Sequence, residues 1–345
     1  MCPVPATPTS PQPSQRPRRY PSDTTDTEWT LLEPLLPPPA CTLTSGGRPE
    51  AHPRREVIDA IRYVVHNSCV WRALPADFPP WPTVYGFFAR WAADGTLDRV
   101  HDALRDQVRV DAGRKPQPSA AIIDSQSVRA ADTVPKQSRG FDAGKKVNGR
   151  KRHIAVDTLG LLLVVLVTAA STQDRDAARA LLWRLRVAQR RVRLVWADAG
   201  YAGKLVVWAA VLGLRVEIVR RRLAHAFQVL PRRWVVERTF AWISRHRRTV
   251  RDYERLPDHH RAMVTWAMTT VMTRRLARRT VPPAPHPPAL PKQHEQVHKT
   301  VTEPFRLWAC GNRPARVGDV VPSVRGGGGS APAVASCHGP GSGSP

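Results

Sequence analysis

Apolar residues in the first third of the chain recur at the spacing of an α-helix. The first such segment starts at Ser22, and three prolines at positions 37–39 end it. Its recurring apolar positions are Trp29, Leu32, Leu35 and Leu36. The same periodicity predicts three more helices, over residues 54–67, from about 82, and over 97–110. We therefore expect a small all-helical domain over residues 22–111.

A short turn separates the second and third of these helices, and the third carries an aromatic stripe and Arg90. Two helices joined in this way are typical of a helix-turn-helix module, in which one helix enters a DNA groove. We predict that this region binds DNA through residues that include Arg90. The alternative is a helical packing domain that does not touch DNA, because the sequence does not show which face meets a groove.

Strands alternate with helices after a Gly/Pro-containing linker over residues 112–119. Predicted strands cover 120–124, 153–156, 161–168, 192–197 and 215–219. Predicted helices cover 174–188, 203–212, about 231–243 and about 257–278. Only a short turn separates the second strand from the third, so we expect a hairpin there. This order matches a ribonuclease-H-like architecture, and it predicts an α/β catalytic domain with a mixed sheet over residues 120–279.

Three acidic residues interrupt apolar segments of this second domain. Asp124 follows the apolar run 120–123, Asp198 follows the run 194–197, and Glu237 lies within a late helix. A carboxylate at the end of a buried strand is costly unless it is paired, hydrogen-bonded or bound to a metal. In a ribonuclease-H-like sheet the first and fourth strands are neighbours, so the two aspartates would share a cleft that the helix of Glu237 crosses.

Such a cleft predicts a divalent-metal site for phosphodiester chemistry. Two Mg²⁺ ions about 4 Å apart can activate the attacking oxygen and stabilise the leaving oxygen. Mg²⁺ prefers oxygen ligands and keeps open water positions, and we expect that Mn²⁺ can substitute. The alternative is three buried carboxylates that are satisfied by other protein groups.

The charge of the chain indicates a polyanionic partner. It holds 53 Lys and Arg against 28 Asp and Glu, a net charge of +25, which points to nucleic acid. Five cations gather between the first two predicted strands, at Lys145, Lys146, Arg150, Lys151 and Arg152. We predict a loop there that contacts DNA phosphates, the alternative being a solvated loop.

Further features bear on compartment and on the ends of the chain. The five cysteines show no CxxC spacing, so we predict neither a zinc site nor disulfides, and a reducing cytoplasm. The longest apolar run, residues 161–170, is too short to span a bilayer, so no membrane association is expected. Residues 1–21 are Pro-rich without an apolar leader, and residues 280–345 are rich in Pro and Gly. We expect both segments to be disordered and without catalytic content.

Several residues near the predicted cleft receive structural interpretations. Asp157 is expected to form backbone hydrogen bonds in the hairpin turn. Asp174 is expected to cap the helix that follows it, the alternative being a role in the cleft. His153 is expected to be structural or to contact phosphate rather than a metal. Tyr201 is expected to pack near Asp198, and Trp234 to lie in the core rather than to stack on a base.

Seven short stretches carry a family resemblance. They are Glu28–Pro37, Val70–Pro75, Trp81–Tyr85, Ile123–Val128, Gly149–His153, Asp198–Tyr201 and Arg232–Phe240. In this order they resemble bacterial insertion-sequence transposases of the DDE type, in the insertion-sequence-five group, over about residues 22–279. No single stretch is decisive, but their order and joint presence are specific.

This resemblance implies that Asp124, Asp198 and Glu237 are the catalytic, metal-binding triad. Arg233 falls four residues before Glu237, on the same helical face, and matches an arginine that related transposases place there. Related groups also carry a tyrosine seven residues before the glutamate and a lysine seven after it. This chain has Leu230 and Ser244 at those positions.

The function expected from these observations is transposition. The protein would bind the terminal repeats of its own element as a dimer or larger assembly, in the cytoplasm on the nucleoid. It would cleave the element ends, and the freed 3′-hydroxyls would attack target DNA. One alternative is a ribonuclease-H-like endonuclease that cuts without strand transfer. Another is a DNA-binding regulator, or an inactive relic, that uses the helical domain alone. Terminal inverted repeats flanking the gene would separate transposase from endonuclease.

Overall fold

The computed structural model describes residues 18–42, 46, 48–219 and 231–280, apart from the side chains of residues 40, 231–233 and 280. All of these residues belong to the first of the two units into which the chain divides, residues 1–285. Apart from Thr280, which ends a helix, the predicted disordered tail over 280–345 lies outside the described residues, as does most of the predicted leader over 1–21. No helix in the described part of the chain is long and apolar enough to cross a membrane.

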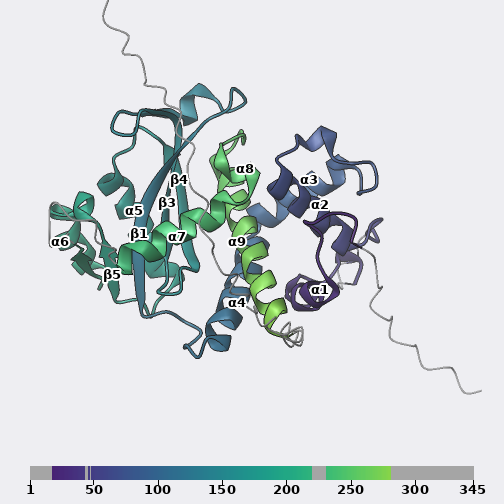
Figure 1. The fold of residues 1–345 in the computed structure, drawn as a ribbon, viewed down its shortest axis with the longest axis horizontal. Helices are drawn as coiled ribbons and strands as arrows, with labels where there is room; N and C mark the ends of the chain where they lie inside the picture. The colour runs from purple at the N-terminus through teal and green to yellow at the C-terminus, as the bar shows by residue number, and fades with distance from the viewer. Residues whose placement is uncertain (1–17, 43–45, 47, 220–230, 281–345) are drawn as a thin grey trace, which may run out of the picture. The chain divides into compact units, whose positions relative to one another are not determined.

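Four α-helices form the N-terminal region, in the order that the periodicity predicts (Figure 1). They are α1 (Asp26–Leu32), α2 (Arg54–Asn67), α3 (Trp81–Ala93) and α4 (Thr96–Asp111). Thr25 caps α1 by accepting a hydrogen bond from the Glu28 backbone N–H. α2 ends at Ser68, which adopts a left-handed conformation with φ of 66°. The turn between α2 and α3 contains a short 3₁₀ helix, η3 (Trp71–Ala73).

A six-stranded mixed sheet follows. Its strands are β1 (Ala120–Arg129), β2 (Gly140–Asp142), β3 (Val147–Val156), β4 (Leu162–Ala169), β5 (Leu194–Ala197) and β6 (Arg215–Ile218). Their order is β2-β3-β1-β5-β6, and β4 also pairs with β3. β3 pairs antiparallel with β1 and β4, whereas β5 pairs parallel with β1 and β6. The predicted hairpin and the predicted neighbourhood of the first and fourth predicted strands, β1 and β5, are both confirmed.

Helices cover both faces of this sheet, as in a ribonuclease-H-like α/β domain. α5 (Asp174–Ala188) and α6 (Lys204–Val211) pack on one face, against alternate strand residues such as Ala121 and Ile123. α7 (Pro231–Ser244) and α9 (Pro257–Thr280) pack on the other, against residues such as Ile122. A short helix, α8 (Arg247–Val250), lies between α7 and α9 in the chain. Odd-numbered residues of β1 therefore face α5, and even-numbered residues face α7.

The first strand and the basic segment differ from their sequence predictions. β1 continues past the predicted end at Asp124, and β3 begins at Val147 rather than at His153. Residues Ser125–Arg129 pair in register with Gly149–His153. Most of the expected loop is therefore a β-ladder. The hydrophobic pattern did not predict it, because the paired residues are mostly polar or charged.

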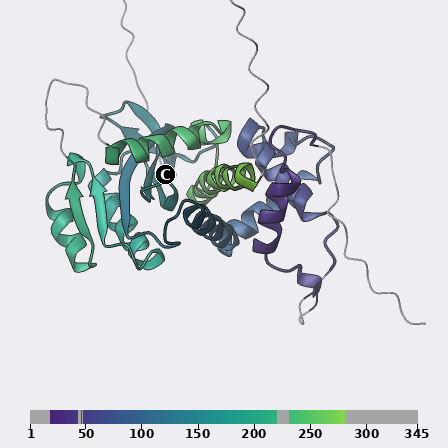
Figure 2. The ribbon, with the colours of Figure 1, turned by 60° about the horizontal axis from the view of Figure 1, so that its bottom comes forward.

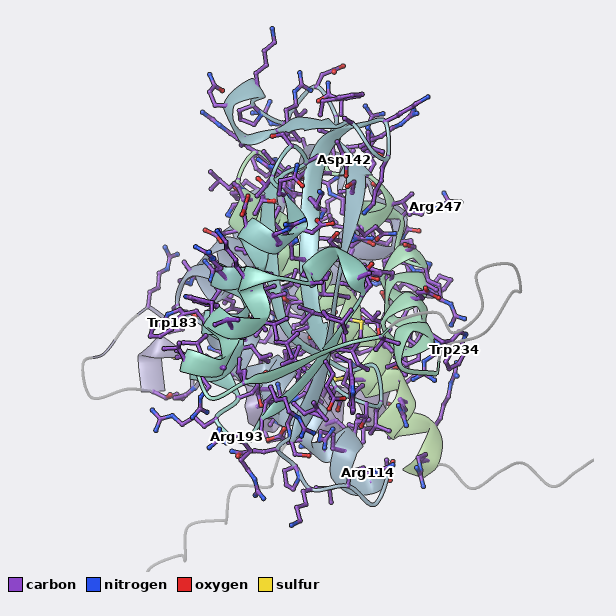
Figure 3. All side chains as sticks on the ribbon, turned by 90° about the vertical axis from the view of Figure 1, so that its left-hand side faces the viewer. Arg114, Asp142, Trp183, Arg193, Trp234 and Arg247 are labelled. Carbon is purple, nitrogen blue, oxygen red and sulfur yellow. The ribbon has the colours of Figure 1, made fainter. Side chains whose placement is uncertain are left out.

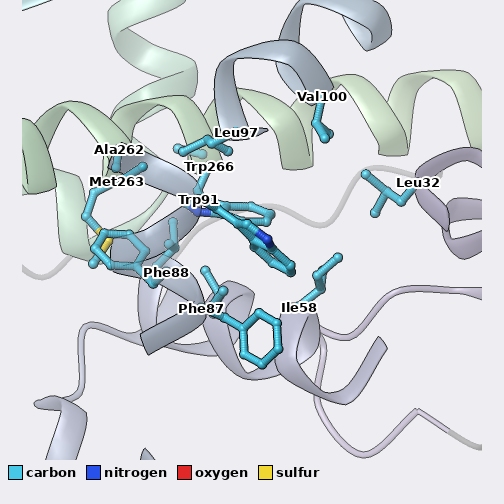
Figure 4. Packing of buried hydrophobic residues seen from close by; sticks show 14 of the residues in the cluster. Leu32, Ile58, Phe87, Phe88, Trp91, Leu97, Val100, Ala262, Met263 and Trp266 are labelled. Carbon is cyan, nitrogen blue, oxygen red and sulfur yellow. The ribbon is translucent and has the colours of Figure 1, made fainter. Parts of the chain in front are cut away.

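α9 contributes to two hydrophobic clusters. Val264 and Met268 pack with the sheet and α7. Six of its other apolar residues join the core of the N-terminal helices, where Trp266 lies 6.2 Å from Trp91 between ring centroids (Figure 4). Figure 2 shows α9 between the sheet and the N-terminal helices. The helical region therefore takes part of its core from a segment that is more than one hundred residues later in the chain.

Candidate active site

Asp124 and Asp198 come from neighbouring parallel strands. β1 and β5 pair in the register Ala120↔Leu194 to Ile122↔Trp196, so Asp124 and Asp198 each lie two residues beyond the last paired position. The even positions of β1 and β5 face α7; Asp124 is an even position of β1, and Asp198 directly follows the end of β5. Both line one recess, together with Val219 and Val236. The tertiary structure thus brings together the two aspartates that the sequence analysis selected.

Each aspartate is oriented by a hydrogen bond from the backbone N–H of a residue that follows it closely in the chain. Asp124 accepts a hydrogen bond through Oδ1 from the Ser125 N–H at 2.7 Å. Asp198 is the N-cap of a 3₁₀ turn, η5 (Ala199–Tyr201), and accepts through Oδ1 from the Gly200 N–H at 2.9 Å. Both side chains are half-buried. These local bonds restrict the rotamers of the two carboxylates at the edge of the recess.

Glu237 lies on α7, the helix that covers this face of the sheet. The preceding residue, Val236, is buried and lines the recess, whereas Glu237 is exposed. Within the described ranges, no three His, Cys, Asp or Glu side chains lie close enough to hold a metal ion. Carboxylate oxygens are the ligands that Mg²⁺ prefers, so the donor type of Asp124 and Asp198 fits a divalent cation. The third carboxylate is on the adjacent helix but is not gathered with them.

A fourth carboxylate, that of Asp174, lies near Tyr201 together with those of Asp124 and Asp198. Tyr201 is buried, and its pKa is raised well above 10 by burial first and then by the negative charges of Asp124, Asp174 and Asp198. The hydroxyl therefore stays protonated at neutral pH. It packs as expected beside the turn that carries Asp198. Asp174 also lies close to it, as in the cleft-facing alternative for this residue.

Asp174 is not the helix cap that its position suggested. The N-cap of α5 is Gln173, and Asp174 is the first helical residue. Its carboxylate Oδ1 lies 3.1 Å from the Lys151 Nζ, which also lies 3.3 Å from an Asp142 carboxylate oxygen. Lys151 is therefore held between two carboxylates on the α5 face. Burial lowers the pKa of His153 on this face to about 4, so the imidazole is neutral, and its Nε2 lies 3.0 Å from the Thr168 hydroxyl.

Three of the cations predicted to contact DNA, Arg150, Lys151 and Arg152, are buried inside the protein. Arg150 has 0% and Arg152 1% of its surface exposed. The Arg150 guanidinium lies 3.0 Å from an Asp252 carboxylate oxygen. Arg152 donates to the Thr249 carbonyl at 2.8 Å, and burial lowers the pKa of its guanidinium to about 10, so it remains charged. Both arginines connect β3 to the segment after α7. Neither of these two guanidinium groups is therefore exposed to a DNA phosphate. The prediction is corrected for these two arginines and for Lys151, which is 5% exposed and lies between Asp142 and Asp174.

The other predicted DNA contacts occupy different places. Lys145 and Lys146 are exposed between β2 and β3, and the Lys145 Nζ donates to the Ser125 carbonyl at 3.3 Å. Arg90 is exposed on α3, with its guanidinium 4.6 Å from the Phe87 ring centroid. The side chain of Arg233 lies outside the described residues, although its backbone is part of α7. Leu230 also lies outside them.

Comparison with known proteins places both parts of this arrangement in one family. Residues 24–101 match a family described as "Putative transposase of IS4/5 family", and residues 115–272 match the family "Transposase DDE domain". The chain is 31% identical over 151 residues to the "Putative transposase for insertion sequence element IS402" of Burkholderia cepacia, a match that covers 41% of this chain and 69% of that protein. The chain belongs to the insertion-sequence DDE transposases of the IS4/5 type.

A second protein of the same element is also similar to this transposase. The "Insertion element IS402 uncharacterized 16.2 kDa protein" of Burkholderia cepacia is 34% identical over 119 residues, which cover 32% of this chain and 76% of that protein. The transposase is thus a DDE polynucleotidyl transferase by class, and it acts on DNA. DDE transposase domains use divalent metal ions, which agrees with the donor type of the Asp124 and Asp198 carboxylates.

Proposed function

We propose that this transposase binds the terminal inverted repeats of its insertion sequence, cleaves the element ends, and joins the freed 3′-hydroxyls to target DNA. The observation that carries the proposal is the pair of aspartates on adjacent parallel strands, facing the helix of Glu237. Asp124 and Asp198 line one recess with Val236, the residue before Glu237. This is the arrangement in which carboxylates from three separate segments can converge on one phosphodiester.

Asp124, Asp198 and Glu237 would hold the metal, which we propose to be Mg²⁺, with Mn²⁺ able to replace it. When bound, two such ions supply activation of the attacking oxygen and stabilisation of the leaving oxygen. The two aspartates are already oriented by backbone N–H groups. Glu237 is exposed one residue after the recess lining, and it would supply the third carboxylate. Tyr201 stays protonated and adds no charge to the site.

DNA contact is proposed for the exposed cations Arg90, Lys145 and Lys146, and for Arg233. Arg150 and Arg152 support the sheet instead, because both guanidinium groups are buried. Lys151 is held by Asp142 and Asp174 and has the same supporting role. We propose that the protein acts as a dimer or larger assembly on DNA, in the cytoplasm on the nucleoid.

The test uses a supercoiled plasmid that carries both element ends. Wild-type protein with Mg²⁺ should nick and cut at the ends, whereas Asp124→Asn, Asp198→Asn and Glu237→Gln should each lose cleavage and keep DNA binding in a gel-shift assay. Asp132→Asn is the matched control, because Asp132 is an exposed acid outside the recess. Mg²⁺-dependent cutting that survives in one of the three variants would remove that residue from the catalytic set.

Strand transfer needs its own readout, because an endonuclease would pass the cleavage test. Pre-cut element ends should become covalently joined to a second plasmid when Mg²⁺ is present. Cleavage without joined products would favour the endonuclease, and DNA binding without either reaction would favour a regulator.

A further inference from the structure

Two arginines from distant parts of the chain donate to the same backbone oxygen. The guanidinium groups of Arg18 and Arg274 both bind the Pro21 carbonyl, at 2.6 and 2.8 Å. Arg18 precedes α1, whereas Arg274 belongs to the C-terminal half of α9. Two donors that share one oxygen are close neighbours, so two positive charges lie side by side on a neutral acceptor. Like charges this close repel each other, and an anion between them would relieve the repulsion.

A pair of histidines lies beside Arg274. His66 of α2 and His246, the N-cap of α8, have ring centroids 6.1 Å apart. Burial first, and then the charges of Arg274 and Arg247, lower the pKa of His66. Burial also lowers the pKa of His246 most, followed by His66 and Arg274. The His246 Nδ1 is buried and has no hydrogen-bond partner within the described residues. Polar groups from α2, α8 and α9 therefore meet around Arg274.

Four arginines make up this arginine cluster, namely Arg18, Arg247, Arg274 and Arg278. Arg278 follows Arg274 by four residues, so both lie on one face of α9. In the part of the chain that the structure describes, none of the four forms an ion pair. Burial lowers the pKa of Arg274, and the negative charge of Glu28 opposes this effect. Glu28 is itself buried in an ion pair with Arg62. The cluster therefore carries positive charge that is available to an anionic partner.

We propose that the arginine cluster binds the phosphate backbone of duplex DNA. This inference rests on the proposed function, because it adds a second surface for the same DNA to Arg90, Lys145 and Lys146. Guanidinium groups bind phosphate through two parallel hydrogen bonds and do so without reading the base sequence. Duplex DNA carries one negative charge per about 1.7 Å of its axis, so several phosphates can reach arginines from separate segments.

The cluster also joins the two parts of the transposase. α9 packs against both the sheet and the N-terminal helices. Arg18 comes from the segment before α1, whereas the other three arginines come from α8 and α9. DNA on this surface would therefore contact the N-terminal helices and the catalytic domain at once.

The salt dependence of DNA binding tests this surface. The probe is a fluorescein-labelled duplex of arbitrary sequence, and its anisotropy gives Kd over a series of KCl concentrations without divalent metal, so that no cleavage occurs. Each lost phosphate contact reduces the slope of log K against log[KCl] by about 0.9. Arg274→Gln and Arg278→Gln should each show this reduction, and the double substitution should show about 1.8. Arg278 is exposed and forms no hydrogen bond within the described residues, so its replacement should leave the fold intact.

The matched control is Arg193→Gln. Arg186 and Arg193 also share a backbone oxygen, that of Arg190, at 2.6 and 2.8 Å. This carbonyl follows the C-terminal end of α5, where the helix dipole favours a cation without any bound anion. Figure 3 shows Arg193 at the lower left and Arg247 at the upper right of the view. The control removes the same charge, and its slope should stay at the wild-type value. Melting temperatures check that each variant is folded.

Two outcomes would overturn the inference and leave the proposed function standing. One is a wild-type slope in both Arg274→Gln and Arg278→Gln, with cleavage of the element ends by the wild-type protein. The other is an equal reduction in Arg193→Gln, which would show that only the total charge matters. Wild-type protein that does not bind the duplex at all would refute both this surface and the proposed function.

Discussion

Arg109 of α4 forms a buried ion pair with Asp157, in the turn between β3 and β4. The other carboxylate oxygen of Asp157 accepts hydrogen bonds from the N–H groups of Leu159 and Leu161, both at 2.8 Å. This confirms the predicted turn geometry and adds a partner 48 residues earlier in the chain. The pair connects the N-terminal helices to the catalytic sheet.

The same turn also supports α7. Arg238 donates to the Leu159 carbonyl at 2.9 Å, and the Thr239 hydroxyl donates to the Gly160 carbonyl at 2.7 Å. Gly160 has φ of +81°, and a Cβ there would lie only 2.9 Å from the Thr239 Oγ1. Glycine therefore allows the turn to approach α7 closely. The placement of the helix that carries Glu237 depends on this turn.

Removal of one partner of the Arg109–Asp157 pair should be strongly destabilising. Arg109→Ala leaves a fully buried carboxylate without its cation, which costs about 3–5 kcal/mol of unfolding free energy. Urea denaturation measures this loss. The exposed pair between Arg279 and Asp111, 3.0 Å apart, provides the comparison, and Asp111→Asn should cost under about 1 kcal/mol. Similar losses in both variants would show that burial does not determine how much the Arg109–Asp157 pair stabilises the protein.

Divalent metal should stabilise the folded protein through the two aspartates. A ligand that binds only the folded state at about one hundred times its Kd adds roughly 2.7 kcal/mol. Mg²⁺ should therefore raise the melting temperature of the wild type, and this rise should shrink in Asp124→Asn and Asp198→Asn. Differential scanning fluorimetry without DNA provides the measurement. An undiminished rise in both variants would place the stabilising metal elsewhere on the protein.

Acid should destabilise the protein through buried neutral histidines. Burial is the main cause that lowers the pKa of His246 to about 3 and of His153 to about 4, from an ordinary value of 6.5. The unfolded chain binds these protons first, so the stabilising contribution is complete above about pH 6.5 and is lost as pH falls toward 3–4. His246→Gln should reduce the fall in urea midpoint between pH 7.5 and 5.

The carboxyl of Asp59 contributes a pH dependence of the opposite sign. Burial raises its pKa from 3.8 to about 6. The folded state therefore binds its proton first, and this group contributes stability at low pH that is lost as pH rises through 6. Because the two effects oppose each other, the histidine contribution is the difference between wild type and His246→Gln at each pH. An unchanged pH profile in the variant would contradict the assignment to His246.

Gly149→Ala should disrupt the pairing of β1 with β3. A Cβ at Gly149 would clash with the Val128 carbonyl oxygen and lie 2.6 Å from the Ala130 backbone N. Both neighbours are backbone atoms that cannot rotate away, so we expect a loss of about 2–4 kcal/mol, in the range for overpacked cores or more. Gly86→Ala is the control, because no atom lies within 4 Å of a Cβ at this helical position. It should be neutral or stabilise by up to about 1 kcal/mol, and equal effects of the two substitutions would rule out the clash.

Local patterns in the sequence determined the helices and the two aspartates, and the order of the elements, matched to a ribonuclease-H-like architecture, predicted that β1 and β5 are neighbours. Helical periodicity predicted α2 over the residues that it occupies, 54–67. The ends of two apolar runs located Asp124 and Asp198, because a carboxylate at the end of a buried strand is conspicuous within a few residues. The same pattern indicated Glu237, an acid within a late apolar segment, and its convergence with the aspartates stays a prediction.

Only the tertiary structure decided which charged residues are buried and which aromatic is exposed. Arg150 donates a hydrogen bond to Asp252, which is 102 residues later in the chain, and Arg152 donates one to Thr249, which is 97 residues later. A basic run has the same pattern whether its cations meet solvent, DNA or distant carboxylates. In the same way, Trp234 fits the apolar face of a helix by its chemistry, but Val236, Phe240 and Ile243 already fill the contact with the sheet. Burial depends on partners far away in the chain, and no local periodicity encodes them.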